Sequence, residues 1–473
     1  MKKRFLQFVS LLLIISLMTA CGGNPSGSNP SVSDAASPSG SGEQTVPGTA
    51  DNEFAEWGAA MKERYGGTTI NALLASHPST TAMLEMIDDF TALTGIKVNT
   101  RVLASTEMKT MQRSNSSTKT GIFDVYMVDA FTVYEYAKAG YIENLEGYLN
   151  DPVMTPEWYD YEDILLAFRD GIASVDGEAY LLPVAGESRF VAYRTDLFEE
   201  HGKKPPETLD EWLELCQYFQ EAGNGEYYGI SFRGAAGTLV GSAHMAVAYC
   251  FSDTPIIDPA TGKYQLDSPE SVQSIQYILD LAKCSSPDIA SMNHEDGAAL
   301  FAQGKCAMWF DATSLAYMVE DPASSTVAGN VGYFDIPSGP AGESGAVAGW
   351  SLGIPTDSQN KEAAYAFSMY MTSRGTAKTY NLAGGVPCRT SVFEDPEILA
   401  MSPSNTAIFS ALNTAGELAE RGVTYNYPSI NVLSFMAVIG NEINRAEVGE
   451  ITAQQAAENA QRQIEAILAE QSA

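Results

Sequence analysis

Basic residues are scarce in this 473-residue chain, in which 27 lysines and arginines face 59 aspartates and glutamates for a formal net charge of −32. A surface with that surplus repels polyanions and releases no counterions by binding them. Nucleic acids and anionic lipid headgroups are therefore poor partners, and we expect no nucleic-acid partner. The charge is typical of a soluble, exported chain but says nothing about its fold.

Histidine is rare as well, and the spacings that hold metals or phosphates are missing. No HExxH-type spacing occurs, so no metal site is indicated. Each Gly-Lys pair lacks the following Ser or Thr that completes a phosphate-binding loop. We therefore expect no metal, no cofactor and no ATP hydrolysis by this chain itself. The four histidines are scattered singly at His77, His201, His244 and His294.

Cysteine is sparse and lacks any CxxC spacing. Apart from Cys21, the cysteines are widely separated and odd in number, which argues against a disulfide scaffold. Most are expected to be buried as small apolar side chains, although one bridge remains compatible with an oxidising location. They are Cys216, Cys250, Cys284, Cys306 and Cys388.

One long apolar run exists, at residues 5–17, directly after the basic residues 2–4. The small residues Thr19 and Ala20 precede Cys21, in the order of a secretory signal with a lipoprotein cleavage site. A transmembrane anchor is the alternative, but the run is shorter than the roughly 20 residues that a spanning helix needs. We predict a signal peptide at 1–20 and lipidation of Cys21, although Met18 stands where leucine is usual.

Large apolar side chains are almost missing from residues 22–52, which consist mainly of Gly, Ser, Pro, Thr and Asp. Such a segment cannot bury enough surface to offset the entropy lost on ordering. We therefore predict that residues 21–65 are the lipidated cysteine and a disordered tether. No further spanning segment follows.

The rest of the chain alternates between strand-like and helix-like segments. An apolar strand at 69–75, a helical pattern at 81–93 and an alternating strand at 96–102 predict a strand-helix-strand unit with parallel strands. Thr208 and Glu211 form a capping box before another helix. The class is therefore α/β, and the remaining roughly 410 residues suit two lobes better than one core. Further buried strands are expected at 124–129, 189–193 and 306–310.

Two enzymatic alternatives fit the residues poorly. Residues 349–353 match GxSxG, but the apolar run continues to Pro355 where a nucleophile elbow needs a helix, and the last histidine, His294, precedes the serine. A glycosidase acid/base pair cannot be inferred from carboxylates alone, because 59 of them produce many chance pairs.

The segment 345–387 carries the most specific combination of residues. A glycine-rich approach leads to Trp350 and a short apolar run that ends at Pro355, and a helical pattern follows at 360–371. A tryptophan at the end of a strand can stack on a ligand or fill a core. The chain carries AGWSLGIP, NKEAA and GGVPCR in this order. It resembles in this the carbohydrate-binding lipoproteins of bacterial ABC importers, the family that includes the maltose-binding protein, whose pattern reads GGW-S-L-x-IP, N-K-E-A-A, GG-V-P-x-R.

Other blocks extend the resemblance over nearly all of the mature chain. FDVYMVDAFTVYEYAKAGYIENLEGYL is similar to the family's first-lobe block, and LLPVAGESRFVAYRTDLFEEHGKKPPETLDEW to the crossing into the second lobe. FAQGKCAMWFDATS resembles the return crossing, and VAGNVGYFDIPSGP is most similar to the polyol-binding branch. The resemblance implies a two-lobe, type II periplasmic-binding-protein fold with a ligand cleft. We expect an N-terminal lobe of 66–183 with 311–372 and a C-terminal lobe of 184–310 with 373–473.

Candidate ligand-binding residues lie just after predicted strands or at predicted lobe crossings, where open α/β sheets bind ligands. Carboxylates and arginines suit hydrogen bonds to hydroxyl groups, and aromatic rings suit the apolar face of a sugar. A turn or capping role is the alternative for each of them. The candidates are His77, Asp129, Phe131, Glu187, Arg189, Asp311, Trp350 and Arg389.

The resulting hypothesis is a non-catalytic receptor for a sugar or polyol that closes its lobes around the solute. The resemblance implies that permease subunits and an ATPase are separate chains, and that the receptor is a lipid-anchored monomer on the extracellular side of the membrane. An exported glycoside hydrolase and a structural lipoprotein remain as alternatives.

Overall fold

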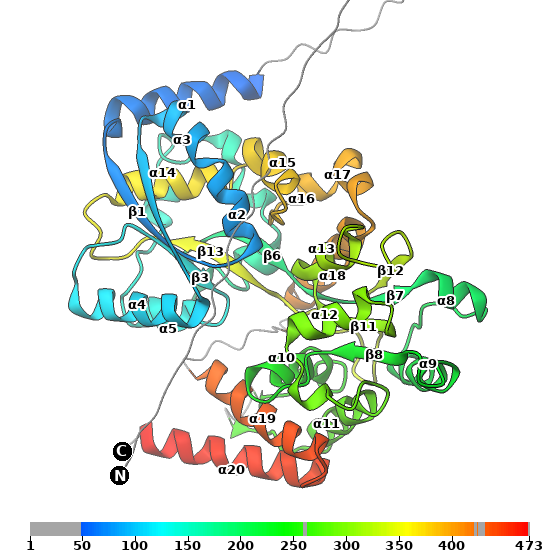
Figure 1. The fold of residues 1–473 in the computed structure, drawn as a ribbon. Helices are drawn as coiled ribbons and strands as arrows, with labels where there is room; N and C mark the ends of the chain where they lie inside the picture. Colours follow the sequence, from blue (N-terminus) through cyan, green and yellow to red (C-terminus); the bar gives the residue numbers. More distant parts are fainter. Residues whose placement is uncertain (1–48, 259–262, 421–422, 424–430, 472–473) are drawn as a thin grey trace, which may run out of the picture. The chain divides into compact units, whose positions relative to one another are not determined.

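The computed structural model describes residues 49–258, 263–420, 423 and 431–471. Their fold contains two larger β-sheets, each with its own helices (Figure 1). The predicted signal peptide, Cys21 and the first part of the predicted tether lie outside the described residues. Among the described residues no helix is long and apolar enough to cross a membrane.

The first sheet has five strands in the order β2-β1-β3-β13-β6. β1 runs parallel to β2 and β3, which confirms the predicted strand-helix-strand unit, whereas β13 runs antiparallel to both β3 and β6. The strands are β1 (Thr69–Ala75), β2 (Lys97–Leu103), β3 (Val125–Asp129), β6 (Leu182–Glu187) and β13 (Ala348–Gly353).

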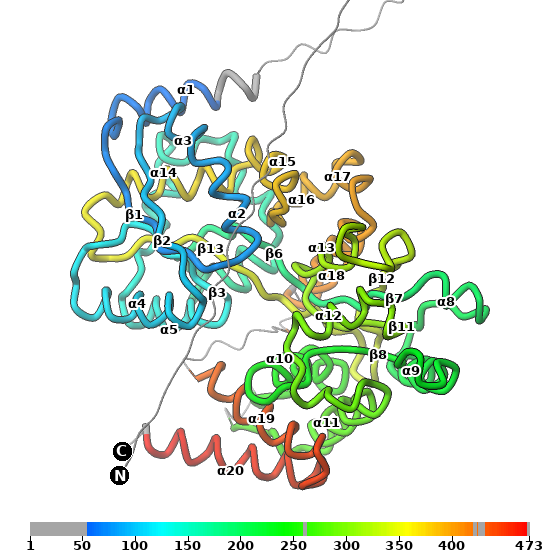
Figure 2. The backbone as a smooth tube through the Cα atoms, viewed as in Figure 1, coloured from blue at the N-terminus to red at the C-terminus, as the bar shows by residue number. Residues whose placement is uncertain are grey.

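Helices from distant parts of the chain surround this sheet, as the smooth trace in Figure 2 makes easy to follow. They are α1 (Thr49–Tyr65), α2 (Pro78–Glu85), α3 (Ile87–Thr94), α4 (Ser105–Thr118), α5 (Val133–Lys138), α7 (Leu166–Arg169), α14 (Lys361–Met371) and α15 (Arg374–Leu382).

The second sheet has four strands in the order β12-β7-β11-β8, of which only β11 and β8 are parallel. Its strands are β7 (Arg189–Arg194), β8 (Tyr228–Phe232), β11 (Cys306–Ala312) and β12 (Val331–Phe334). The helices grouped with it are α8 (Thr195–Glu200), α9 (Leu209–Ala222), α10 (Thr238–Ala248), α11 (Pro269–Ala282), α12 (His294–Ala302), α13 (Ala316–Glu320), α19 (Val432–Glu447) and α20 (Ala453–Gln471).

Short elements complete the chain. They are α6 (Glu146–Leu149), α16 (Thr390–Phe393), α17 (Pro396–Met401), the longer α18 (Pro403–Glu420), the 3-10 turns η1 (Glu157–Tyr159), η2 (Tyr161–Asp163), η3 (Ile289–Ser291) and η4 (Thr313–Leu315), and the strand pairs β4 (Ser174–Val175) with β5 (Glu178–Ala179) and β9 (Ile257–Asp258) with β10 (Lys263–Tyr264).

The core covers both faces of the four-stranded sheet. Phe190 and Trp309 belong to the apolar cluster that also contains the five-stranded sheet, whereas their neighbours Val191 and Phe310 belong to a second cluster with α9, α10, α11, α19 and α20. This division follows the alternation of side chains along a strand. The first cluster therefore continues from one sheet to the other.

The predicted tether is too long at its C-terminal end. Residues 49–65 form helix α1, in which Trp57 and Met61 are buried in the first cluster. Trp57 packs edge-on against Trp158, with ring centroids 6.1 Å apart. Composition alone did not reveal this helix, because its apolar residues find their partners about a hundred positions later.

The predicted lobe boundaries also need correction. Residues 311–372 were assigned to one lobe, but β12 pairs with β7 in the four-stranded sheet, so the chain returns to the five-stranded sheet only after Phe334. Residues 373–473 were assigned to the other lobe, but α15 packs against α1, α2 and α14, which belong to the five-stranded sheet. Strand pairing and packing over long sequence distances decide these boundaries.

Candidate functional site

Six of the eight predicted site residues lie at the ends of five strands or within two residues of them. His77 follows β1 and is the N-cap of α2, where its Nδ1 accepts a hydrogen bond from the backbone N–H of Ser79 at 3.2 Å. The others at strand ends are Asp129 and Phe131 (β3), Glu187 (β6), Arg189 (β7) and Asp311 (β11).

His77, Glu187 and Trp350 form one cluster. The Nε2 of His77 lies 2.9 Å from Oε1 of Glu187, and because Nδ1 accepts a bond from Ser79, Nε2 carries the proton. The His77 and Trp350 rings are 5.8 Å apart between centroids. The histidine is thereby held between a carboxylate and an indole face.

Opposing effects act on the pKa of Glu187. Burial raises it, but the hydrogen bond and charge of His77 and the charge of Arg233 outweigh burial, so the pKa is lowered below its ordinary value. Glu187 is consequently an anion that accepts hydrogen bonds at neutral pH. A carboxyl with a lowered pKa is unsuited to donate a proton as a general acid.

Trp350 stands opposite Asp129 in the pairing of β13 with β3, and a register shift follows it on the β6 side. The preceding Gly349 has a φ of 141°, and a Cβ there would lie 2.1 Å from the carbonyl oxygen of Ala185. Only glycine fits that position. The glycine-rich approach seen in the sequence therefore allows the strand to bring the half-buried Trp350 to the site.

Asp129 is fixed by an ion pair with Lys109 of α4 and by two further bonds. Its Oδ1 accepts hydrogen bonds from the backbone N–H of Phe131 at 3.1 Å and from Oγ1 of Thr132 at 2.9 Å. Phe131 itself is half-buried and packs against the second core cluster, so its ring contacts the apolar side of the other sheet.

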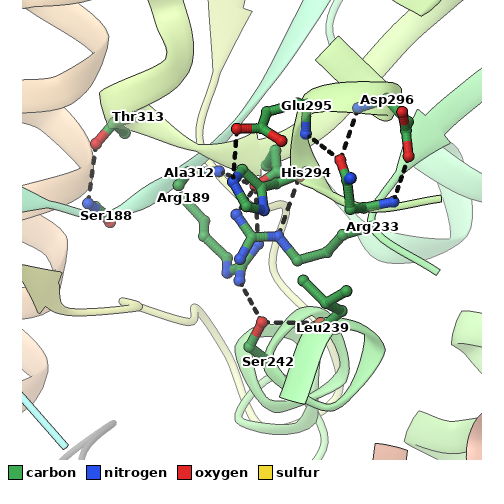
Figure 3. Close-up of polar contacts among 12 residues, drawn as sticks. Ser188, Arg189, Arg233, Leu239, Ser242, His294, Glu295, Asp296, Ala312 and Thr313 are labelled. Carbon is green, nitrogen blue, oxygen red and sulfur yellow. Dashed lines mark hydrogen bonds and ion pairs between the residues drawn. The ribbon is translucent and has the colours of Figure 1, made fainter. Parts of the chain in front are cut away.

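The third group of site residues surrounds Asp311, which is fully buried. Figure 3 shows its neighbours Arg189, Arg233 and Ser242. Arg233 holds Asp311 with two of its guanidinium nitrogens, Nε and Nη2, and Nε lies 3.1 Å from Oδ2. Nη1 of Arg189 lies 3.7 Å from Oδ1, and its Nη2 donates to Oγ of Ser242 on α10 at 2.8 Å. Two guanidinium groups thus share one carboxylate, and the charge of Arg233 also acts on Glu187.

The crossing between the two sheets joins the group around Asp311 to the group around Glu187. Ser188, between Glu187 and Arg189, exchanges hydrogen bonds with Thr313: its N–H donates to Oγ1 and its carbonyl accepts from the Thr313 N–H, both at 3.0 Å. Oγ of Ser188 also donates to the carbonyl of Ala346 at 2.6 Å. Residues of β6, β7 and β11 are therefore held at one place.

Arg389 does not join this group. Its side chain is 1% exposed, and Nε donates to the carbonyl of Thr372 at 2.7 Å. Nη1 lies 3.1 Å from Oδ2 of Asp163, and the guanidinium carbon lies 4.6 Å from the centre of the Tyr159 ring. The prediction that Arg389 binds ligand is replaced by a structural role, because tertiary packing places the motif's last residue in the core.

Three polar residues of the site were not predicted: Lys109, Arg233 and Ser242. Arg233 directly follows the buried strand β8, so the rule that found the other candidates would have found it once the YGISF segment was read as a strand. Lys109 and Ser242 lie on helices, where no local pattern distinguishes them from surface residues.

The arrangement offers many hydrogen-bonding groups but no catalytic pair. Among the described residues no group of three or more His, Cys, Asp or Glu side chains could hold a metal ion. The five cysteines in that part of the chain are buried and free. Carboxylates, guanidinium groups and an indole face together suit a ligand with several hydroxyl groups.

Comparison with known proteins also indicates a solute-binding protein. A sequence model described as "Bacterial extracellular solute-binding protein" matches residues 75–378. The erythritol/L-threitol-binding protein of Mycolicibacterium smegmatis is 26% identical over 350 residues, which cover 69% of this chain and 72% of the relative.

Solved structures of similar fold support the two-lobe architecture. An ABC transporter solute-binding protein from Agrobacterium vitis with bound D-mannitol is 28% identical, with a TM-score of 0.72 over 85% of this chain and 99% of its own. Another from Agrobacterium radiobacter, in complex with ribitol, has a TM-score of 0.74 at 24% identity and covers 84% and 98% of the two chains.

Proposed function

Because this chain belongs to the bacterial extracellular solute-binding protein family, whose members bind solutes rather than catalyse reactions, we propose that it captures a small carbohydrate or polyol and delivers it to the permease of an ABC importer. The observation that carries the proposal is the convergence of Glu187, Asp311 and Trp350 with their partners at the ends of strands from both sheets. Permease and ATPase are separate chains, and the receptor acts as a monomer.

The charges of the site favour a neutral ligand. Glu187 is paired with His77, Asp129 with Lys109, and Asp311 with Arg233 and Arg189. An anionic or cationic solute would have to compete with one of these pairs, whereas a hydroxyl group can donate to a carboxylate and accept from a guanidinium group without breaking them. Polyols and neutral sugars fit this pattern.

An acyclic polyol is the preferred member of this class. A relative is named for erythritol and L-threitol, and the structure from Agrobacterium vitis holds D-mannitol. Trp350 and His77 supply one apolar wall, and the remaining contacts are polar, which suits a flexible chain bearing a hydroxyl group on each carbon. Ring-shaped sugars are tested as well, because the wall formed by Trp350 and His77 can also stack against a sugar ring.

The solute is captured because it binds the closed state of the receptor more tightly than the open state. A solute that contacts Glu187 at the end of β6 and Arg233 directly after β8 binds the closed arrangement of the lobes more tightly than the open one, and so shifts the population toward closure. The closed form then docks on the permease. Lipidation at Cys21 would keep the receptor at the extracellular side of the membrane, with the segment before α1 as its tether.

The test is a panel of mannitol, ribitol, erythritol and maltose, measured by calorimetry and by the shift in melting temperature. A ligand at a hundredfold excess over its Kd stabilises the folded chain by about 2.7 kcal/mol. We expect at least one polyol to do so, and Glu187→Gln to lose that effect. The matched control is Glu178→Gln, an exposed carboxylate on β5.

Small-angle scattering separates capture from passive binding. The radius of gyration should fall when the stabilising polyol is added and stay constant with a non-binding one. A panel without any stabilising solute would refute carbohydrate capture, and saturation without a change in scattering would refute closure.

A further inference from the structure

A recess lies on the side of the second sheet, apart from the ligand site. It is lined by parts of α9, β8, α11 and α19 and by the segments that follow α11 and α19, and none of its residues belongs to the proposed polyol site. Its volume of about 560 Å³ is in the range of small-molecule sites. The residues that matter below are Leu279, Lys283, Ser285, Ile289, Glu447 and Ile451.

Glu447, at the end of α19, lines this recess and has one unsatisfied carboxylate oxygen. Its Oε1 is buried and has no hydrogen-bond partner in the described residues. Its Oε2 accepts one long bond, 3.4 Å, from Nδ2 of Asn444, which donates at shorter distance to the carbonyls of Ala290 (2.7 Å) and Gly234 (3.1 Å). The asparagine is thus largely engaged elsewhere.

The cationic side chains near Glu447 form ion pairs with other carboxylates. Lys283 lines the recess, but its Nζ lies 2.7 Å from Asp280, and Arg445 is held by Glu442 and Glu450. In the described part of the chain no lysine or arginine pairs with Glu447. Burial raises the pKa of Glu447 to about 8, as expected for a carboxyl that lacks a cation.

A second buried polar atom lies in the same recess. Oγ of Ser285, 6% exposed as a residue, also lacks a hydrogen-bond partner within the described segments. Leu279, Ile289 and Ile451 form apolar walls around these two acceptors. Buried polar atoms are normally paired, so two in one recess call for a ligand that can donate to both.

We propose that this recess is a second binding site, which takes an organic cation with a short aliphatic stem, an alkylguanidinium or alkylammonium group. The cation donates hydrogen bonds to Glu447 and Ser285, and its stem lies against Leu279 and Ile451. A bare metal ion fits less well, because one carboxylate and one hydroxyl supply too few ligands.

The cation can come from a free small molecule or from an arginine or lysine side chain of a partner protein. The net charge of −32 attracts either one. Two probes distinguish these sources: ethylguanidinium represents the free cation, and N-acetylarginine amide represents a side chain attached to a peptide backbone. Ethylurea, of similar shape but neutral, is the control ligand.

The experiment titrates the three probes into the full chain at pH 8 and follows binding by calorimetry. We expect one or both cations to bind with unit stoichiometry and ethylurea not to bind. Glu447→Gln should weaken cation binding at least tenfold, and Ser285→Ala by a smaller factor. Glu450→Gln, at an exposed carboxylate three residues along the chain, is the matched control and should leave binding unchanged.

Polyol binding is measured in the same samples and should be unaffected by Glu447→Gln, which also shows that the variant is folded. Binding of the free cation supports a small-molecule site, and binding of the peptide-like probe alone supports a protein side chain. The proposal is overturned if neither cation binds, or if Glu450→Gln weakens binding as much as Glu447→Gln does. A failure of polyol binding alone would count only against the proposed transport function.

Discussion

At the scale of single residues, each charged side chain of the polyol site is held by an oppositely charged neighbour. Asp311 is the clearest case, since a fully buried carboxylate shares two guanidinium groups. Such pairs cost desolvation energy and contribute little net stability compared with apolar residues of the same size. Their retention is better explained by the hydrogen bonds that they can offer to a ligand.

Trp350 provides a direct test of ligand stacking. Trp350→Ala removes the half-buried indole beside His77 while the strand backbone stays paired. We expect at least about 2 kcal/mol loss of binding, roughly thirtyfold in Kd, as for central aromatic anchors. Calorimetry gives the affinity and ligand-free melting gives the stability. A large drop in melting temperature with unchanged affinity would assign Trp350 to the core instead.

Arg389 is expected to behave in the opposite way. Arg389→Met leaves Asp163 without its buried cation and frees the carbonyl of Thr372. Breaking a buried ion pair from one side commonly costs about 3–5 kcal/mol. Urea unfolding should show that loss, polyol affinity should stay constant in the folded fraction, and the exposed Arg374→Met serves as control. A selective loss of affinity would return Arg389 to the site.

Glu447 predicts a pH dependence of stability. Its folded-state pKa of about 8 lies above the ordinary 4.5, so the folded chain binds more protons than the unfolded chain between these values. Stability therefore falls as pH rises through this window, by up to about 1.4 kcal/mol per unit, and the loss ends above pH 8. Glu447→Gln removes this contribution.

Chemical unfolding at pH 5 and pH 8 measures the effect. The difference in unfolding free energy between variant and parent should move in favour of Glu447→Gln at the higher pH. The unfolding free energy of Glu450→Gln should change between the two pH values as that of the parent does. If the unfolding free energy of both variants changes with pH as that of the parent does, Glu447 is not held protonated by the fold.

At the scale of elements, local signals predicted where helices begin and end better than which face they bury. The capping box of Thr208 and Glu211 is present at the start of α9, and Gly95 closes α3 in the left-handed conformation. The helix predicted over 81–93 is instead two helices that meet at Met86, which leaves Leu84 39% exposed. The continuous helical face assumed from the spacing does not exist.

Helix α1 supplies a prediction at this scale. Trp57→Ala should destabilise the folded chain by about 3–5 kcal/mol, because a buried aromatic side chain is removed from the first core cluster. The exposed Glu56→Ala, one residue earlier on the same helix, is the control. Thermal melting of both variants is sufficient. Equal melting temperatures would mean that α1 belongs to the tether after all.

At the scale of the whole molecule, the path of the chain between sheets creates the site. β6 passes into β7 at Ser188, and the chain returns from β12 to β13 before Trp350 reaches Asp129. Residues separated by more than two hundred positions thereby meet. The proposed anchor lies outside this folded body, so anchoring and folding should be separable.

Cys21→Ser tests the anchor. The variant should move from the membrane fraction to the soluble fraction, since lipidation requires the thiol. Polyol affinity and melting temperature should stay at the parent values. Membrane retention of the variant would contradict lipidation at this residue.

The sequence by itself determined the α/β class, the parallel β1–β2 pair and most of the polar positions at strand ends, because apolar runs and the residues that interrupt them are local features. It could not determine that Arg389 is buried, that Lys109 and Arg233 complete the ion pairs, or that β12 joins the second sheet. Those outcomes depend on contacts between residues far apart in the chain. Only the tertiary structure decides them, since the energy of a buried charge or a paired strand depends on its partner rather than on its neighbours in sequence.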